Sequence, residues 1–389
     1  MIKVKISEVA KINAKSLNKN DNLIKIKYLD TGNITEGKID EIKEYNTEID
    51  KIPSRAKRRV KKNTIVYSTV RPRLKHYGIL KETDENLIVS TGFVTIDANP
   101  EKVNPLYLYY QLTKENVTNY LGDIADTAVS SYPSITPDDI GNIEIDLIPI
   151  EEQNKIGEYL NLFDEKINNN NNIYNSMESM LKTLYEYWFY QYEFPNNDGN
   201  PYKSSGGKLV WNEQLKKNIP EGWQVKKVSE LLNVVTGKKD ANFATKNGKY
   251  NFFTCANDIS KCDEYEFEGK SVLIAGNGDF NVKYYNGKFN AYQRTYVLIP
   301  EEEKYIGLIY QSAIRKINTF KRGSNGSIVK FITKGDIDNL DIIIPNDSRL
   351  IDSINNNMDM LQNIKDENER LESTRKFLLS ILINKKQLD

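Results

Sequence analysis

The chain has 389 residues and a formal net charge of zero, and it contains no apolar run that approaches the roughly 18 residues of a membrane span. Its length predicts more than one domain, and its start, MIKVKISEVAK, is typical of a charged strand rather than of a secretory signal, so we expect a cytoplasmic protein. The two cysteines, Cys255 and Cys262, are spaced as C-x6-C, which matches neither a zinc site nor a redox pair, so we expect ordinary thiols.

Residues 1–148 have the pattern of a strand-rich domain with interspersed helix. Apolar alternation predicts strands at residues 23–29, 64–70, 87–96 and 143–148, and a helix rich in leucine and tyrosine at residues 103–120. We therefore expect a mixed α/β domain in this part of the chain.

Two basic segments lie between these expected strands. Residues 51–62 hold seven cations and no acid, and residues 69–77 mix three cations with a histidine and a tyrosine. Such segments can bind phosphates, and arginine can also form two hydrogen bonds to the edge of a guanine base. A solvated surface loop is the alternative interpretation. His76 is the only histidine of the chain, so we do not expect a histidine-based metal site or nucleophile.

Residues 149–194 predict one long helix. Pro149 followed by Glu151 and Glu152 suits a helix start, because proline fits the first turn and carboxylates favour the positive end of the helix dipole. Steps of four and three residues then form the seam of a coiled coil, made of Ile156, Leu160, Phe163, Ile167, Asn170, Tyr174, Met177, Leu181, Leu184 and Trp188. Asn170 is its only polar break, and we expect it to set the register of a helix pair.

The rest of the chain repeats this organisation. A turn-rich segment at residues 195–207 opens a second globular part that runs to residue 345. Residues 227–231 echo residues 4–9, and residues 332–342 echo residues 135–145, which indicates an internal duplication. Residues 346–389 predict the partner helix, with a seam of Leu350, Ile354, Asn357, Leu361, Ile364, Asn368, Leu371, Arg375, Leu378 and Leu382. We expect the two helices to pair in antiparallel fashion.

The neutral total charge hides an uneven distribution. The net charge is +1 for residues 1–148, −5 for 149–194, +5 for 195–345 and −1 for 346–389. The expected globular parts are therefore cationic and the expected helices acidic, which favours a polyanion-binding surface on the globular parts.

Catalytic motifs are missing from the sequence. Gly269-Lys270-Ser271 has Glu264 where a P-loop requires glycine, and Asn104-Pro105 lacks the second proline of an amino-methyltransferase motif. Asp263 with Glu268 and Lys270 imitates a nuclease metal site, but so charged a chain yields such matches by chance. We therefore expect no catalytic residue and no metal site on this chain.

The order of several short motifs resembles the specificity subunits of type I restriction-modification systems. The motifs are Pro149-Ile-Glu-Glu-Gln153, the stretch from Gly199 through Trp211 to Trp223, Ser68-Thr-Val-Arg-Pro72 and Ser90-Thr-Gly-Phe93. The second half departs from the pattern, because it reads Leu273-Ile-Ala-Gly-Asn-Gly278 where the first half has Ser-Thr-Val-Arg-Pro. We therefore expect the halves to read different sequences.

The resemblance implies an α+β protein with an internal pseudo-two-fold duplication. Two mixed α/β target-recognition domains, residues 1–148 and 195–345, would each precede a long antiparallel spacer helix, residues 149–194 and 346–389. Each domain would read half of a bipartite site in double-stranded DNA, and the helices would dock two methyltransferase subunits and, where present, restriction subunits. S-adenosylmethionine, ATP and Mg would be bound by those partners, so no cofactor is expected on this chain. The outer helix faces near Tyr185, Tyr187, Phe189 and Tyr192 would bind the partners.

Within this interpretation, the expected DNA contacts are loop residues. In the first half they are Arg55, Lys57, Arg58, Arg59, Arg71, Arg73, Lys75, Tyr77, Ser130, Ser131 and Tyr132. In the second half they are Lys238, Lys239, Asn242, Asn277, Lys283, Tyr284, Gln293, Arg294, Lys321, Arg322, Ser324 and Asn325. Asparagine and glutamine suit adenine, arginine suits guanine, and lysine suits phosphate. For any one of these residues a plain surface role is the alternative, and for the tyrosines a core role.

Two other functions remain open from the sequence. One is a coiled-coil scaffold that tethers two protein-binding domains without recognising DNA, and such a scaffold should show no salt-dependent binding to duplex DNA. The other is an autonomous methyltransferase or nuclease, which would bind S-adenosylmethionine or cut DNA with a metal.

Overall fold

The computed structural model describes residues 2–18, 21–127, 133–322 and 331–383. The chain divides into two compact units. Unit 1 comprises residues 1–169 and 369–389, and unit 2 comprises residues 170–368. Both long helices cross from one unit to the other, so each unit contains a segment of each helix.

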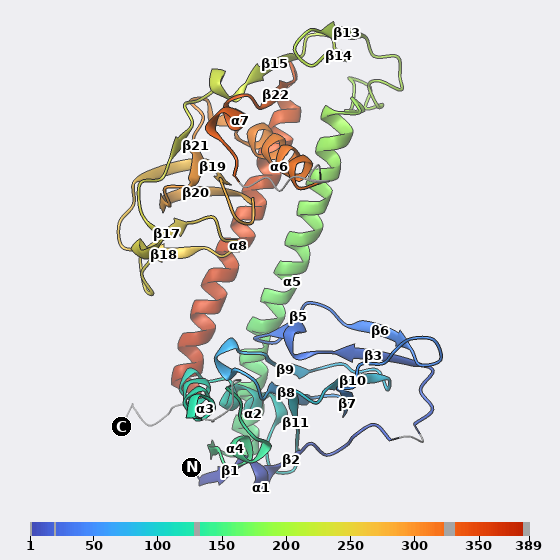
Figure 1. The fold of residues 1–389 in the computed structure, drawn as a ribbon, viewed down its shortest axis with the longest axis vertical. Coiled ribbons are helices and arrows are strands. Elements are labelled where there is room, and N and C mark those ends of the chain that lie inside the picture. The colour runs from blue at the N-terminus through green and yellow to red at the C-terminus, as the bar shows by residue number, and fades with distance from the viewer. Residues whose placement is uncertain (1, 19–20, 128–132, 323–330, 384–389) are drawn as a thin grey trace. The chain divides into compact units, whose positions relative to one another are not determined.

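Unit 1 is built on two four-stranded sheets, with strand orders β6-β3-β10-β7 and β2-β11-β8-β9 (Figure 1). Its strands are β1 (Ile2–Lys5), β2 (Ala10–Ile12), β3 (Lys25–Leu29), β4 (Ile34–Thr35), β5 (Lys38–Ile39), β6 (Lys43–Asn46), β7 (Ala56–Arg59), β8 (Thr64–Ser68), β9 (Tyr77–Leu80), β10 (Leu87–Ser90), β11 (Phe93–Ala98) and β12 (Glu144–Leu147). Its helices before α5 are α1 (Ile6–Val9), α2 (Pro105–Leu112), α3 (Glu115–Thr127) and α4 (Pro137–Gly141), with short 3₁₀ helices η1 (Thr31–Asn33) and η2 (Pro72–Leu74).

The core of unit 1 has two layers that meet at β8. Ile65 and Tyr67 pack with the helices α2 and α3, whereas Val66 faces the other way and packs with residues of β3 and β10. Every residue of β8 is buried, so its polar ends Thr64 and Ser68 lie inside the fold together with the three apolar residues between them.

Two sequence predictions for unit 1 were too coarse. Residues 87–96 form two strands, β10 and β11, which belong to different sheets because the chain turns at Thr91-Gly92. Residues 103–120 form parts of two helices, because α2 ends at Leu112 and α3 begins anew at Glu115. Both helices bury apolar residues, so the apolar pattern continues across the break.

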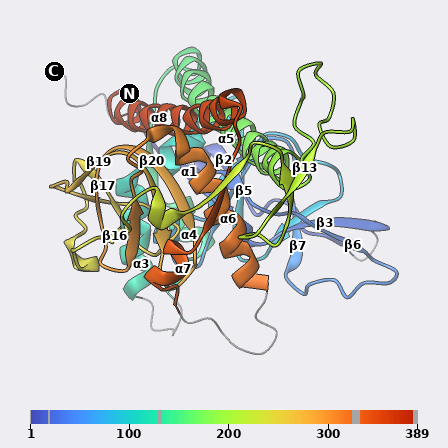
Figure 2. The same cartoon turned by 90° about the horizontal axis from the view of Figure 1, so that it is seen from above.

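Unit 2 is built on one six-stranded sheet, with strand order β16-β21-β19-β20-β17-β18. Its strands are β13 (Leu209–Asn212), β14 (Lys217–Pro220), β15 (Gln224–Lys227), β16 (Val235–Thr236), β17 (Tyr250–Phe253), β18 (Ser260–Cys262), β19 (Phe267–Ala275), β20 (Val282–Ala291), β21 (Thr295–Leu298) and β22 (Asp341–Ile344). Its shorter helices are α6 (Ile306–Arg322), α7 (Lys334–Asp338), η3 (Val228–Glu230), η4 (Ala241–Phe243) and η5 (Glu303–Tyr305). Helix α6 packs against β19 and β20 (Figures 1 and 2).

The two units repeat the same local structure, which confirms the duplication. In unit 1, β1 pairs antiparallel with β12, and in unit 2, β15 pairs antiparallel with β22. Thr136 caps α4 through a reciprocal pair of bonds with Asp139, and Thr333 caps α7 through the same pair with Asp336. The echoes in the sequence are therefore the residues that close each domain with a capped helix and a strand.

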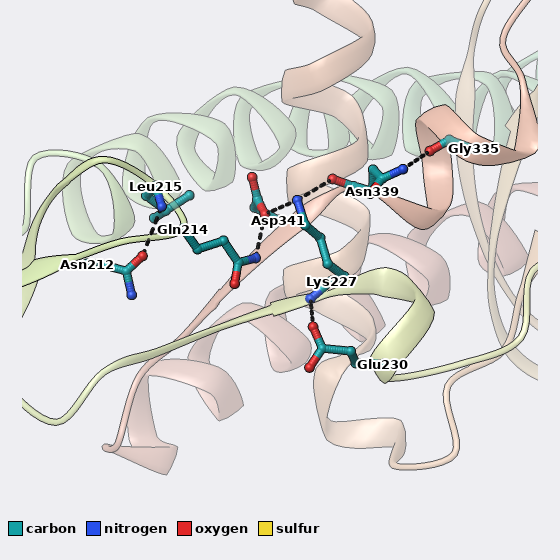
Figure 3. A network of polar contacts seen from close by, with 8 residues as sticks. All are labelled: Asn212, Gln214, Leu215, Lys227, Glu230, Gly335, Asn339 and Asp341. Atoms are coloured by element: carbon teal, nitrogen blue, oxygen red, sulfur yellow. Dashed lines mark hydrogen bonds and ion pairs between the residues drawn. The ribbon is translucent and has the colours of Figure 1, made fainter.

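A polar network secures this closing element in unit 2 (Figure 3). Lys227 donates from its ammonium group to Asp341 at 2.7 Å and to the carbonyl of Asn339 at 3.1 Å, and Glu230 accepts from the Lys227 N–H at 2.7 Å. Gln214 on the β13–β14 hairpin donates to the same Asp341 carboxylate at 2.7 Å. The hairpin is thus fastened to the β15–β22 ribbon, and unit 1 has no hairpin of this kind among its described residues.

The long helices are α5 (Ile150–Phe189) and α8 (Ser348–Ile383). Helix α5 ends before the expected residue 194, because Tyr192 adopts a left-handed φ of +63° and the Glu193 N–H closes back onto the Tyr187 carbonyl at 3.0 Å. Within unit 2, Asn170 contacts Asn368 and Tyr174 contacts Lys365, so the helices run antiparallel, as predicted.

Polar groups interrupt the apolar seam in both units. In unit 2, Asn170 is buried and donates to Glu367 at 2.7 Å and to Asn368 at 2.9 Å, while Asn368 donates to Asn171 at 2.9 Å. In unit 1, Asp164 of α5 forms an ion pair with Arg375 of α8. The seam residues Asn170, Asn368 and Arg375 therefore bond across the helix pair.

The expected outer face near the end of α5 was largely wrong. Tyr185, Phe189 and Tyr192 are buried in the core of unit 2, and the Tyr185 hydroxyl lies 2.9 Å from Ser312. Only Tyr187 of the four is exposed. These three aromatic side chains belong to the hydrophobic core of unit 2, where each buries a large apolar ring.

Candidate nucleic-acid interface

Unit 1 brings four loop segments together at one end of its sheets. The Thr69 N–H donates to the Gly92 carbonyl at 2.9 Å, and the Thr69 carbonyl accepts from the Ile135 N–H at 2.9 Å. The Thr91 N–H donates to the Arg55 carbonyl at 2.8 Å. These bonds join segments that are far apart in the sequence into one continuous surface.

The segment that links β8 to β9, residues 69–76, is called the first turn below. Arg73 holds it against α3, because its guanidinium donates to Asp123 at 2.5 Å and to Asp126 at 3.0 Å. A Cβ at Gly122 would lie 2.2 Å from that guanidinium, so the glycine of α3 makes room for Arg73. Lys75 pairs with Glu36 at 2.7 Å. Both cations are thus engaged within the protein.

The remaining predicted cations of unit 1 differ in exposure. Arg55, Lys57 and Arg71 are exposed, and no side-chain partner is found for them among the described residues. Arg58 and Arg59 lie on the edge strand β7 and are half-buried, and Arg59 lies 3.4 Å from Asp21. The Nε atom of Arg58 is buried without a hydrogen-bond partner in the described part of the chain.

Tyr77 was wrongly expected at the surface. It is 4% exposed and stacks on Tyr67 with 5.3 Å between ring centroids, and burial raises its pKa. It belongs to the core because it begins strand β9, whose alternate residues face α2 and α3. Ser130, Ser131 and Tyr132 lie outside the described residues.

Unit 2 assembles the corresponding surface from its own loops. The Gly276 N–H donates to the Arg294 carbonyl at 2.9 Å, and the Gly276 carbonyl accepts from the Ile332 N–H at 2.7 Å. The Gln293 N–H donates to the Lys239 carbonyl at 3.0 Å. Each of these bonds has a counterpart in unit 1, so the segment from β19 to β20, residues 276–281 and called the second turn below, matches the first turn.

Among the predicted residues of unit 2 whose side chains are described, most have partners within the protein. Lys238 pairs with Glu266 at 2.5 Å, Gln293 donates to Asp240 at 2.8 Å, and the Tyr284 hydroxyl donates to Asp359 at 2.7 Å. The Lys239 ammonium group lies 4.4 Å from the Phe243 ring centroid and 3.9 Å from Glu264. Lys283 donates to the Ala256 carbonyl at 2.6 Å and to Asn281 at 2.5 Å.

Lys283 lies beneath the surface of unit 2. Its burial lowers its pKa to about 8, and its bonds connect the second turn to the loop around Ala256. A positioning role fits it better than a phosphate contact, because a half-buried ammonium with two internal acceptors is poorly placed to reach outward.

Three predicted residues of unit 2 remain open at the surface. Asn242 and Arg294 are exposed and Asn277 is half-buried, and no side-chain partner is found for them in the described ranges. Lys321 and Arg322 belong to the last turn of α6, but their side chains, together with Ser324 and Asn325, lie outside the described residues.

The sequence prediction missed residues that hold the two turns in place. His76 lies with Nδ1 2.7 Å from the Ile34 carbonyl, and Asn281 donates to the Cys255 carbonyl at 2.9 Å. Both occupy the last position of their turn. The first turn is longer than the second, so an alignment of the two halves at Thr69 and Gly276 does not place His76 and Asn281 opposite one another. Only the bonds that close the turns show that the two residues correspond.

The described residues were compared with two further kinds of site, a metal cluster and a membrane helix. In the described part of the chain, no three histidine, cysteine, aspartate or glutamate side chains gather as metal ligands would. Among the same residues, no helix has both the length and the apolar character of a membrane span.

Both halves of the chain match one protein family. The family is described as the type I restriction modification DNA specificity domain, and it matches residues 1–179 and 220–373, more than half of the chain. The chain belongs to this family. The match falls separately on each copy of the repeated structure, so the specificity domain occurs twice in this chain.

Curated members of the family show the same likeness. The chain is 41% identical over 132 residues to the specificity subunit of the type I restriction enzyme EcoDI of Escherichia coli, which covers 33% of this chain and 29% of that protein. It is 28% identical over 166 residues to the HindI specificity subunit of Haemophilus influenzae, which covers 43% and 36%. The chain spans about a third of the length of these relatives.

A solved structure agrees over nearly the full chain. The S subunit of a type I restriction-modification system from M. genitalium superposes with a TM-score of 0.59 at 17% identity, covering 98% of this chain and 96% of that chain. The likeness concerns the fold, and it confirms the predicted arrangement of two mixed α/β domains with long helices.

Proposed function

We propose that this chain is the DNA-binding specificity subunit of a type I restriction-modification complex. Residues 1–148 and 195–345 would be its two target-recognition domains, and each would bind one half of a bipartite duplex target. Residues 149–194 and 346–389 would be its spacer helices. The observation that carries the proposal is that each unit of a family member builds the same loop surface and furnishes it with different side chains.

The charge distribution supports duplex DNA as the ligand. The two globular segments carry net charges of +1 and +5, whereas the helical segments carry −5 and −1. Arg55, Lys57 and Arg71 in unit 1 and Arg294 in unit 2 are exposed on or beside the joined loops. Cations without internal partners are available to phosphates and base edges.

The partners would be two methyltransferase subunits and, in some complexes, restriction subunits. Unit 2 offers an apolar stripe for such docking, because Ile173, Met180 and Tyr187 follow one another on α5 at seven-residue spacing and are 49%, 58% and 39% exposed. Seven-residue spacing keeps side chains on one face of a helix. The stripe lies outside the seam that faces α8.

Chemistry would belong to those partners. The methyltransferase subunits would bind S-adenosylmethionine, and a restriction subunit would bind ATP with Mg. This chain would select the DNA sequence on which they act. A location in the cytoplasm, where chromosomal and invading DNA are accessible, completes the proposal.

DNA binding by the full chain tests the proposal directly. We expect the affinity for a duplex to fall steeply with salt, with a slope of log K against log salt of about −4 or steeper, because several phosphates are neutralised. Arg55→Ala and Lys57→Ala should each make the slope shallower by about 1. Fluorescence anisotropy across a salt series measures this.

Lys11→Ala is the matched control. Lys11 is exposed and lies opposite Asp97 in the antiparallel pairing of β2 with β11, at the end of β11 remote from Gly92, so its replacement should leave the slope unchanged. Binding without salt dependence in the wild-type chain would instead favour a scaffold that tethers protein-binding domains.

The register of the helix pair gives a second prediction. Asn170→Leu alone should lower the free energy of unfolding by about 1 to 2 kcal/mol, because the side-chain oxygen of the half-buried Asn368 and the Glu367 carboxylate both lose a donor. Asn170→Leu combined with Asn368→Leu removes both amides of this bond and should recover most of the loss, while Glu367 and Asn171 each lose one donor. Chemical unfolding compares the three chains.

The same pair of variants also tests the proposed spacer. If the polar layer sets the register, the doubly substituted chain should select bipartite targets with a less uniform gap than the wild type does. An unchanged gap together with unchanged stability would show that Asn170 does not set the register of the helix pair.

A further inference from the structure

The first and second turns share one backbone frame. Each begins at a residue, Thr69 or Gly276, whose N–H and carbonyl are both bonded to neighbouring loops. Each closes in the same manner, because the Ser68 N–H donates to the His76 carbonyl at 2.8 Å and the Ala275 N–H donates to the Asn281 carbonyl at 3.0 Å. The side chains between these fixed ends are free to differ.

The left-handed positions of the turns coincide. The third residue of the first turn is Arg71, with φ +48°, and the third residue of the second turn is Gly278, with φ +70°. The next-to-last residues, Lys75 and Phe280, have φ +56° and +45°. Two left-handed residues at matching places show that the frame, and not the local sequence, dictates the backbone.

Arg71 raises the conformational energy of the first turn, because it is a non-glycine residue at a positive φ. Glycine adopts a positive φ without strain, whereas a long side chain does not, and the following Pro72 restricts the backbone of Arg71 further. Unit 2 uses glycine at the matching place. Strain retained at an exposed residue points to a role for its side chain.

Arg71 differs from the other cations of the first turn in its side-chain contacts among the described residues. Arg73 and Lys75, its neighbours in the turn, are bound to acidic residues of the protein, whereas the Arg71 side chain has no partner among the described residues. In the second turn, Asn277 stands between two glycines and likewise lacks a side-chain partner in the described ranges.

We propose that these turns determine base specificity, with Arg71 selecting guanine in one half-site and Asn277 selecting adenine in the other. The inference rests on the proposed function, because it assumes that the loop surfaces face DNA. Arginine forms two parallel hydrogen bonds to O6 and N7 of guanine, and the asparagine amide pairs in the same way with N6 and N7 of adenine. Asn277 lies one position before Gly278, the residue that matches Arg71, so the shared frame would present the two side chains from adjacent positions of corresponding turns. The difference between half-sites would then arise from both the residue and its place in the turn.

Selection from a duplex library with two randomised half-sites tests the assignment. The full chain is incubated with the library, and the bound duplexes are sequenced. We expect Arg71→Lys to keep its salt-dependent affinity but to lose the preference for one guanine, and Asn277→Ala to lose the preference for one adenine in the other half only. The wild-type chain should bind its target about 10- to 100-fold more tightly than a duplex mismatched at that base, and each substitution should abolish this ratio at its own base.

Arg71→Gly separates a reading role from a structural one. Glycine relieves the left-handed strain, so the midpoint of thermal unfolding should stay the same or rise while the guanine preference disappears. A structural arginine would instead lower the midpoint. Lys11→Ala is again the control, and both preferences should survive in it.

The outcomes distinguish the inference from the function on which it rests. A wild-type chain that selects no bipartite motif would overturn the proposed function itself. A wild-type chain that selects a bipartite motif, together with Arg71 and Asn277 variants that select the same motif, would overturn only the assignment of the two turns.

Discussion

Arg375→Leu is expected to lower the free energy of unfolding by about 3 kcal/mol, the largest effect that we anticipate from a single side chain of the helix pair. Arg375 forms an ion pair with Asp164, and the side chains are only 22% and 17% exposed. Removing the cation leaves a carboxylate in a site that water reaches poorly. The value lies at the lower end for buried pairs because the site is not fully closed to solvent.

In the Arg375→Leu chain, Tyr110 would be the remaining side-chain donor described for the Asp164 carboxylate. Its hydroxyl donates to the second oxygen of Asp164 at 2.6 Å, and burial together with the charge of Asp164 raises the pKa of Tyr110, so it remains a donor at neutral pH. One hydrogen bond is insufficient to hold a desolvated charge. We therefore expect unfolding of the Arg375→Leu chain to become easier at neutral pH, as denaturant titration would show.

The double replacement Asp164→Leu with Arg375→Leu provides the matched control. It removes both charges and should recover most of the loss, because well-packed apolar residues commonly replace a buried ion pair without cost. If the double variant were as unstable as Arg375→Leu, the loss would come from packing of the arginine side chain and not from the unpaired carboxylate.

Gly237→Ala is expected to destabilise unit 2 by about 3 kcal/mol and to weaken the DNA binding that we propose for its loop surface. A Cβ at Gly237 would lie 2.0 Å from the Ala291 carbonyl oxygen and 2.7 Å from that of Tyr292. Both contacts are with backbone atoms of the main sheet, which cannot rotate away. The chain must move at Gly237 instead, and Lys238 and Lys239 move with it.

Gly32→Ala is the control for this substitution. No atom lies within 4 Å of a Cβ built at Gly32, so alanine should change the unfolding midpoint little. Thermal unfolding and a salt-dependent binding assay on both variants make the comparison. Wild-type stability in Gly237→Ala would mean that the loop around Lys238 moves without cost.

Much of the architecture could be predicted because it depends on periodic patterns. The heptad seams predicted α5 and α8 as long helices, and the echo between residues 135–145 and 332–342 predicted two copies of one closing element. The break between β10 and β11 was not predicted, because Val94 and Ile96 continue the apolar pattern while the chain passes from one sheet to another.

The candidate interface was predictable only as a set of basic loops. The positions of Arg55 and Arg71 at the surface agree with their place in those loops, but nothing in the sequence separated them from Arg73, which binds α3, or from Tyr77, which is buried. A cation and its internal partner are remote in the sequence, as Arg73 and Asp123 are, so the pairing is invisible until the chain folds.

The sequence by itself determined the duplication, the helical seams and the separation of cationic from acidic segments, because each of these follows from local composition and repeat spacing. Only the tertiary structure decided which cations remain available, which tyrosines become core, and that Arg71 stands where the other half has Gly278. The physical reason is that burial and pairing are properties of contacts between distant residues. A turn frame held by Thr69 or by Gly276 cannot be recognised until the loops that bond to it have come together.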